Sequence, residues 1–215
     1  MIPLTDVSRR PTTFPIVTLS LIVINVIAFV IELLNDEQFV LQWSMVPANI
    51  TAGNHLMTIL TSMFMHGSWS HIIGNMIFLW AFGPEVEDSM GKVRYSAFYL
   101  VGGVAAALAQ VAIDPHSTVP SLGASGAIAA VMGAFLVTFP TDQIKTVLVL
   151  FVFVMIRYIP AVILIGFWFL SQLWNAGAVT STEAGGVAYS AHIGGMLFGM
   201  VFARLFQRPQ ASYAG

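Results

Sequence analysis

Long stretches without a charged residue constrain this chain more than any other feature of its sequence. Residues 14–31 and 95–113 are two of them, and a helix needs about 20 mostly apolar residues to cross the hydrocarbon core of a bilayer. Charged residues make up 8% of the chain, whereas soluble domains carry about 25% because their surfaces face water. The sequence therefore predicts an all-α membrane protein with several spans.

Six segments have the length and apolar character of membrane-spanning helices. They are residues 14–34, 70–90, 94–113, 122–140, 158–175 and 188–206. Lys and Arg concentrate in cytoplasmic loops, so their positions test this count. With six spans and a cytoplasmic N-terminus, all eight Lys and Arg residues lie on the cytoplasmic side, and five or seven spans would break that pattern. We therefore predict a polytopic six-helix bundle with both termini in the cytoplasm.

The bundle is predicted to occupy residues 14–206, between cytoplasmic tails of residues 1–13 and 207–215. The outer connection, residues 35–69, has too short an apolar part to cross the bilayer, and we expect it to lie partly in the membrane interface. Residues 144–156 are apolar but also too few for a span. We expect this second segment to lie at the inner interface.

Composition excludes several classes of function. The chain has no cysteine and a formal net charge of −2, which excludes disulfides, thiolate zinc sites and cysteine nucleophiles and leaves no broad basic face for nucleic acid. The sequence contains neither a His-Glu-x-x-His motif nor a pair of mid-span aspartates, the features of other intramembrane proteases. We expect no metal, no cofactor and no nucleic-acid partner, and the lipid bilayer as the main surrounding.

Four polar residues lie near the outer starts of predicted spans. They are His71, Asn75, Ser125 and His192. Ionisable side chains inside membrane helices are rare and usually face a cavity or the interior of the bundle. Because the second, fourth and sixth spans all enter from the outer side, the four side chains are predicted to share one depth in the membrane.

Ser125 and His192 have the chemistry of a nucleophile and its base. A serine hydroxyl becomes a useful nucleophile when a histidine about 2.6–3.2 Å away accepts its proton. Small residues surround both, in Gly123-Ala-Ser125-Gly and in His192-x-x-Gly195-x-x-x-Gly199, and such patterns let two helices approach closely. No carboxylate lies in the outer half of either span, so we predict a Ser–His dyad. Considered singly, each residue could instead make a structural hydrogen bond.

His71 and Asn75 are four residues apart and therefore share one face of a helix. Their N–H groups, together with the backbone N–H of Ser125 at a helix start, can stabilise the oxyanion that develops during acyl transfer. A structural bond between helices is the alternative interpretation of this pair.

Three spaced motifs resemble those of the rhomboid proteases. They are His66-x-Ser68-x-x-His71-x-x-x-Asn75, Gly123-Ala-Ser125-Gly and Ala191-His192-x-x-Gly195-x-x-x-Gly199. With Gly83-x-x-x-Glu87-x-x-x-Gly91, in which we expect Glu87 to tie the second span to the third, the resemblance extends over about residues 60–205.

The resemblance implies a six-helix intramembrane serine endopeptidase that needs no cofactor or metal. Its substrates would be other membrane proteins, cut in or next to their transmembrane segments. The resemblance gives Ser125 the role of nucleophile and His192 that of general base and acid. It assigns the oxyanion site to His71, Asn75 and the Ser125 N–H. It also makes the fifth span and its outer loop, residues 174–187, candidates for a lateral gate.

One position departs from the family pattern. Ala129 stands one turn after Ser125, where some rhomboids have a tyrosine that packs on the catalytic histidine. Another aromatic side chain or tighter packing is therefore expected to orient His192.

Two alternative functions stay open from the sequence. One is an inactive rhomboid-like protein that binds clients, which the presence of both Ser125 and His192 disfavours. The other is a small transporter, which the lack of an internal repeat, of matched broken helices and of a mid-membrane acid disfavours. Short termini without an added domain are typical of prokaryotic proteins, so we expect a prokaryotic inner membrane with the active site near the outer face.

Overall fold

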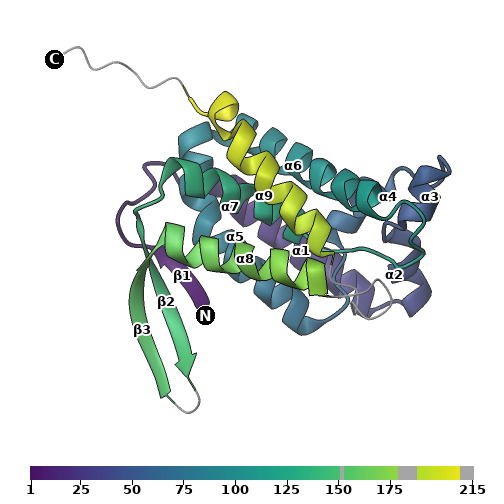
Figure 1. Cartoon of the computed structure of the whole chain (residues 1–215), viewed down its shortest axis with the longest axis horizontal. Coiled ribbons are helices and arrows are strands. Elements are labelled where there is room, and N and C mark those ends of the chain that lie inside the picture. The colour runs from purple at the N-terminus through teal and green to yellow at the C-terminus, as the bar shows by residue number, and fades with distance from the viewer. Residues whose placement is uncertain (151–152, 179–187, 209–215) are drawn as a thin grey trace.

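A bundle of long helices dominates the computed structural model, which describes residues 1–150, 153–178 and 188–208 (Figure 1). Six helices of 14 to 22 residues form it. They are α1 (Ile16–Leu33), α5 (Trp69–Met90), α6 (Lys92–Ile113), α7 (Ser125–Thr138), α8 (Ala161–Ala178) and α9 (Tyr189–Phe206). Each helix end lies within three residues of the end predicted from the apolar runs. The mostly helical architecture is thereby confirmed.

Length and composition identify two of these helices directly as candidate membrane spans. Within the described residues, α1 and α6 are long and apolar enough to cross a bilayer, whereas α7 and residues 161–176 of α8 are apolar but shorter. α5 carries three acids near its C-terminal end, Glu85, Glu87 and Asp88, which make it more polar than a simple span. The number of crossings therefore stays a prediction.

α7 forms the centre of the bundle. Every residue from Gly126 to Phe135 is buried, and the helix packs on α5, α6 and α9. A methyl group on Gly195 would collide with the carbonyl oxygen of Gly126, and one on Gly199 with that of Ala130. Only glycine allows backbones to come this close, so the predicted close packing of the fourth and sixth spans is confirmed.

Glu87 of α5 caps the start of α1. Its carboxylate accepts hydrogen bonds from the backbone N–H groups of Val17 and Thr18, at 3.0 and 2.8 Å, and from the Thr18 hydroxyl at 2.8 Å. The first N–H groups of a helix have no partner inside it, and this carboxylate supplies one. Glu87 thus ties the second long helix to the first, whereas the sequence predicted a tie to the third.

The outer connection folds into short helices that cannot cross a membrane. They are α2 (Glu37–Trp43), α3 (Pro47–Thr51), α4 (Thr58–Thr61) and the 3-10 helix η1 (Ser62–Phe64). α2, α3 and α4 gather at one end of the bundle (Figure 1). Residues 179–187 of the predicted gate lie outside the described residues.

A three-stranded antiparallel sheet lies at the opposite end of the bundle (Figure 1). Its order is β1 (Ile2–Asp6), β2 (Gln143–Leu150) and β3 (Phe153–Pro160). The all-α prediction is therefore incomplete: residues 2–6 of the predicted tail form a strand, and residues 144–156 fall in a hairpin. The Val, Ile and Tyr content of the hairpin favours strands. Its outward side chains, such as Val149, Phe153 and Val154, are apolar too, which hid the strand alternation in the sequence.

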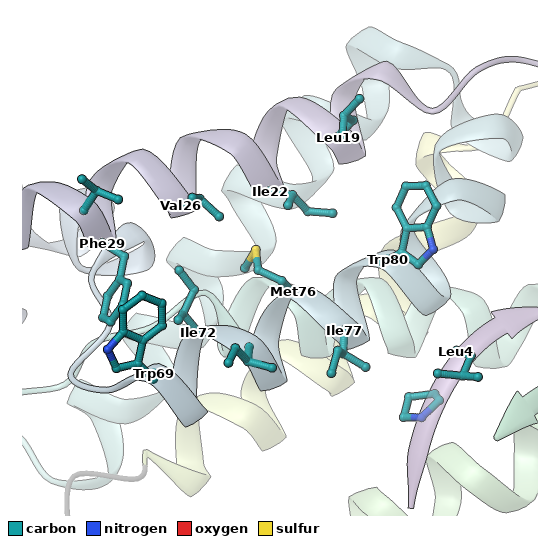
Figure 2. A pocket seen from close by; sticks show the side chains of 13 residues that line it. Leu4, Leu19, Ile22, Val26, Phe29, Trp69, Ile72, Met76, Ile77 and Trp80 are labelled. Atoms are coloured by element: carbon teal, nitrogen blue, oxygen red, sulfur yellow. The ribbon is translucent and has the colours of Figure 1, made fainter. Parts of the chain in front are cut away.

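An apolar groove of about 550 Å³ lies between α1 and α5 (Figure 2). Leu4 of β1 lines one end of it, and the rings of Phe29 and Trp69 meet at the other, with centroids 5.0 Å apart. None of the four candidate site residues lines the groove. The four candidate site residues therefore lie away from this groove, on another side of α5.

Candidate active site

Ser125 and His192 meet where α7 and α9 begin. Ser125 is the first residue of α7 and His192 the fourth of α9, and the Ser125 Oγ lies 2.6 Å from the His192 Nε2. Proton transfer from a hydroxyl to an imidazole requires this distance. The glycine contacts between α7 and α9, one and two turns further along α9, hold the two helices close enough for it.

His71 and Asn75 of α5 reach the loop that precedes Ser125. A methyl group on Gly123 would lie 2.7 Å from the His71 Nε2 and 3.6 Å from the Asn75 Nδ2. Both predicted oxyanion donors are therefore grouped two residues before Ser125. The Ser125 N–H belongs to the first turn of α7, where backbone N–H groups lack a partner inside the helix.

The loop before Ser125 is fixed by hydrogen bonds to the outer connection. The Gly123 N–H donates to the Ser62 carbonyl at 2.8 Å, and Ser121 exchanges two backbone bonds with Met45, at 2.7 and 3.0 Å. On the other side, the Ser68 hydroxyl caps α5 by accepting from the His71 N–H at 3.2 Å. The loop before Ser125 and the start of α5 are thus both held in place by hydrogen bonds.

His66 holds the side chain of Asn75. The His66 Nδ1 faces the Phe64 carbonyl at 3.2 Å, so this nitrogen carries the proton and the Nε2 accepts from the Asn75 Nδ2 at 2.9 Å. Burial, followed by the nearby His71, lowers the pKa of His66 to about 4. The ring is therefore neutral near pH 7, remains an acceptor and leaves the second amide hydrogen of Asn75 free.

A small cavity borders Ser125. It has a volume of about 30 Å³, is lined by Ser62, Gly103, Gly126 and Ala191 among others, and is large enough for one water molecule. Among the described residues, no three His, Asp or Glu side chains form a group that could hold a metal ion. The side chains gathered around Ser125 are suited to acyl transfer and to hydrogen bonding.

A family model for the Rhomboid domain matches residues 53–209. The matched range includes all four candidate residues on α5, α7 and α9. The chain belongs to the rhomboid family. Rhomboids are polytopic integral membrane proteins, and the family consists in large part of serine proteases that act within the membrane.

Curated relatives of this rhomboid come from yeast, cattle and a plant. Rhomboid protein 1, mitochondrial, of Saccharomyces cerevisiae is 32% identical over 67% of this chain and 40% of that protein. Presenilin-associated rhomboid-like protein, mitochondrial, of Bos taurus is 31% identical over 66% of this chain and 36% of its own length. Rhomboid-like protein 11, chloroplastic, of Arabidopsis thaliana is 32% identical over 71% of this chain and 54% of its own length.

The chain spans about half or less of the length of these relatives. The names of these relatives place them in mitochondria and chloroplasts. The comparisons therefore support an integral membrane protein and give no support to the predicted prokaryotic inner membrane.

Two residues lie beside His192 to which the sequence alone assigned no role there. The Gln172 Oε1 lies 2.8 Å from the His192 Nδ1, and the Trp168 ring lies 5.6 Å from the imidazole between centroids, with the planes 39° apart. Because Ala129 stands where some rhomboids have a tyrosine, another aromatic neighbour of His192 was expected, and Trp168 is such a neighbour. A signal existed in the sequence, because a glutamine and a tryptophan four residues apart share one face of a predicted span.

Proposed function

We propose that this rhomboid is an intramembrane serine endopeptidase that cuts membrane proteins in or next to their transmembrane segments. The observation that carries the proposal is the 2.6 Å separation of the Ser125 Oγ and the His192 Nε2. A serine with only a structural role at a helix start does not require an imidazole nitrogen at this distance. Membership in a family of intramembrane proteases supplies the substrate class.

The proposed reaction begins when the Ser125 Oγ attacks the carbonyl carbon of the scissile peptide bond. The His192 Nε2 takes the hydroxyl proton as the new C–O bond forms, and then gives it to the leaving amine nitrogen as the C–N bond breaks. Water attacks the resulting acyl ester with His192 again as the base. His192 returns the proton taken from water to the Ser125 Oγ as the ester C–O bond breaks. The new carboxylic acid loses its proton to solvent and leaves as a carboxylate.

The oxyanion of each tetrahedral intermediate is proposed to bind beside Gly123. The donors are the His71 ring, the free hydrogen of the Asn75 amide and the Ser125 backbone N–H. Donors fixed in place before the reaction need no reorganisation when charge develops, and removing one of them costs about 10²–10³ in kcat in other serine proteases. The bond between Asn75 and His66 supports such fixed placement.

The six long helices are proposed to be six membrane spans, within a protease domain of residues 14–206. The distribution of all eight Lys and Arg residues supports this topology. It puts both termini in the cytoplasm, the outer connection of residues 35–69 at the other surface, and the site near that surface. A polar cavity open to that side can supply the water that hydrolysis needs.

Cleavage of a model transmembrane substrate tests the proposed function. We expect the purified protein, reconstituted in liposomes, to cleave it and to react covalently with a fluorophosphonate, and both activities to disappear in Ser125→Ala and His192→Ala. Ser20→Ala and His116→Ala are matched controls, because the Ser20 hydroxyl bonds its own helix at Ile16 and His116 is exposed. Cleavage by Ser125→Ala would contradict the assignment.

A further inference from the structure

The His192 imidazole makes its second hydrogen bond to a neutral amide. We propose that Gln172 positions His192 by holding the imidazole in the tautomer that accepts the Ser125 proton. Gln172 lies on α8, is 7% exposed and places its Oε1 at 2.8 Å from the His192 Nδ1. The inference rests on the proposed function and names a third residue for the site.

The contacts of the amide nitrogen decide which way the Gln172 side chain points. Its Nε2 donates to the Ser171 Oγ at 3.0 Å and to the Trp168 carbonyl at 3.4 Å. The Ser171 hydroxyl donates its own proton to the same carbonyl at 2.6 Å, so its oxygen is left as an acceptor. With the amide reversed, the Oε1 would face the Trp168 carbonyl oxygen and gain no bond there. The amide oxygen therefore faces His192.

An oxygen beside the His192 Nδ1 determines the tautomer of the ring. The amide oxygen only accepts hydrogen bonds, so the Nδ1 must carry the proton and the Nε2 must carry the lone pair. That lone pair faces the Ser125 hydroxyl at 2.6 Å. In the other tautomer the Nδ1 lone pair would face the Gln172 oxygen, and one buried hydrogen bond would be lost.

In the Ser-His-Asp triad a buried aspartate fixes the tautomer of the histidine, and it also stabilises the imidazolium that forms. Gln172 can supply the first effect but carries no charge for the second. The Trp168 ring limits rotation of the imidazole from one side. Together the Gln172 amide and the Trp168 indole orient the imidazole. In some rhomboids a tyrosine at the position of Ala129 has this role.

Replacing the acceptor tests the proposal. In Gln172→Leu we expect kcat to fall about tenfold or more, the effect of one buried hydrogen bond, with KM unchanged because no substrate contact is lost. Gln172→Glu keeps an acceptor oxygen and should retain kcat within about threefold. Gln110→Leu on α6 is the matched control and should leave kcat unchanged. An unchanged kcat in Gln172→Leu would overturn the proposal.

The tautomer can be measured without any turnover. In protein labelled with ¹⁵N-histidine, the His192 signals, assigned by comparison with His192→Asn, should show a protonated Nδ1 in wild type and in Gln172→Glu. Gln172→Leu should lose this preference while its thermal unfolding midpoint shows that it is folded. A purely structural glutamine would leave the tautomer unchanged, and that result would also overturn the proposal.

The two proposals fail in different ways. If wild type cleaves, Ser125→Ala does not, and Gln172→Leu keeps full kcat, only the role of Gln172 is wrong. If Ser125→Ala still cleaves, the proposed function is wrong, and the ¹⁵N spectrum alone decides whether Gln172 orients the ring.

Discussion

Gly123 is a residue at which the site does not readily accept a side chain. Its φ of 122° lies in a region that L side chains rarely adopt, and a methyl group there would lie 2.7 Å from the His71 Nε2. The glycine thus keeps open the space beside the proposed oxyanion donors. At the scale of single residues, the proposed chemistry thus depends on an absent side chain as well as on the hydroxyl of Ser125.

Gly123→Ala is expected to lower kcat/KM about 10²-fold or more, because the methyl group occupies the oxyanion space and displaces His71. Cleavage of a transmembrane peptide at equal concentrations of folded protein measures the loss. Gly53→Ala is the matched control, since Gly53 also has a positive φ, of 76°, but a methyl group there meets no atom within 4 Å. Equal activity in the two variants would contradict the proposed role of the space beside Gly123.

At the scale of helices, the contact between α7 and α9 sets the distance between the proposed nucleophile and the proposed base. Ser125 and His192 each lie in the first turn of their own helix, and the glycines that follow bring the two backbones together. Any change that separates these helices should lengthen the Ser125–His192 contact. The packing of the bundle and the chemistry of the site therefore depend on the same residues.

Gly199→Ala should test this coupling between packing and chemistry. The added methyl group would collide with the Ala130 carbonyl, and overpacking of this kind costs about 1–3 kcal/mol. We expect a lower thermal midpoint together with a large loss of cleavage and of fluorophosphonate labelling in the fraction that stays folded. Gly166→Ala on α8, where a methyl group meets no atom within 4 Å, should preserve both activities.

The junction of the sheet and the bundle contains two carboxyl groups in opposite electrostatic settings. Arg9 forms an ion pair with Asp142 and lies over the Phe139 ring at 4.0 Å from its centroid. Hydrogen bonding to Arg9 lowers the pKa of Asp142 below its usual value, whereas burial raises the pKa of Asp6 to about 6. Near pH 7 the Asp142 carboxylate stabilises the junction and the Asp6 carboxylate destabilises it.

Asp6→Asn should therefore stabilise the protein at high pH. A carboxyl group with a raised pKa contributes stability that is complete below its unfolded value of 3.8 and lost as the pH rises through about 6. We expect the thermal midpoint of Asp6→Asn in detergent to exceed that of wild type at pH 8 and to match it near pH 4. A difference that does not depend on pH would contradict this account of Asp6.

Asp142→Asn should have the opposite effect at pH 8. A lowered pKa contributes stability above the unfolded value of 3.8, which is lost as the pH falls through the folded value. The variant also leaves Arg9 without its partner. Its thermal midpoint at pH 8 should fall below that of wild type, and a midpoint equal to or above that of wild type would contradict this account of Asp142.

At the scale of the whole molecule, the chain has two ends with different characters. The short helices of the outer connection gather at one end, near the starts of α7 and α9, and the sheet lies at the other (Figure 1). The apolar groove runs between them along α1 and α5 (Figure 2). With the proposed topology, a bilayer around the bundle would separate the end that holds Ser125 and His192 from the proposed cytoplasmic end.

Single cysteines can test this orientation, because the chain has none of its own. We expect a membrane-impermeant maleimide to label His116→Cys in intact cells and to label Lys92→Cys only after the membrane is opened. Both side chains are exposed, one in the loop before α7 and the other at the start of α6. Labelling in the reverse order would contradict six spans with cytoplasmic termini.

The sequence by itself determined the long helices and which residues were candidates for the site. A run of about 20 apolar residues has few structures open to it in a bilayer, because every backbone N–H and C=O must find a partner within the protein. Spacing along a helix is a local property, so His71 with Asn75, and His192 with Gly195 and Gly199, were predicted to share faces as the structure has them.

Tertiary structure alone decided which distant segments meet. β1 pairs with β2 across more than a hundred residues of chain, and Glu87 caps α1 instead of binding α6. Gln172 and His192 lie on different helices, and no spacing rule connects them across the intervening loop. Such contacts depend on how whole helices pack against one another, and a sequence pattern states which faces are apolar but not which partner each face selects.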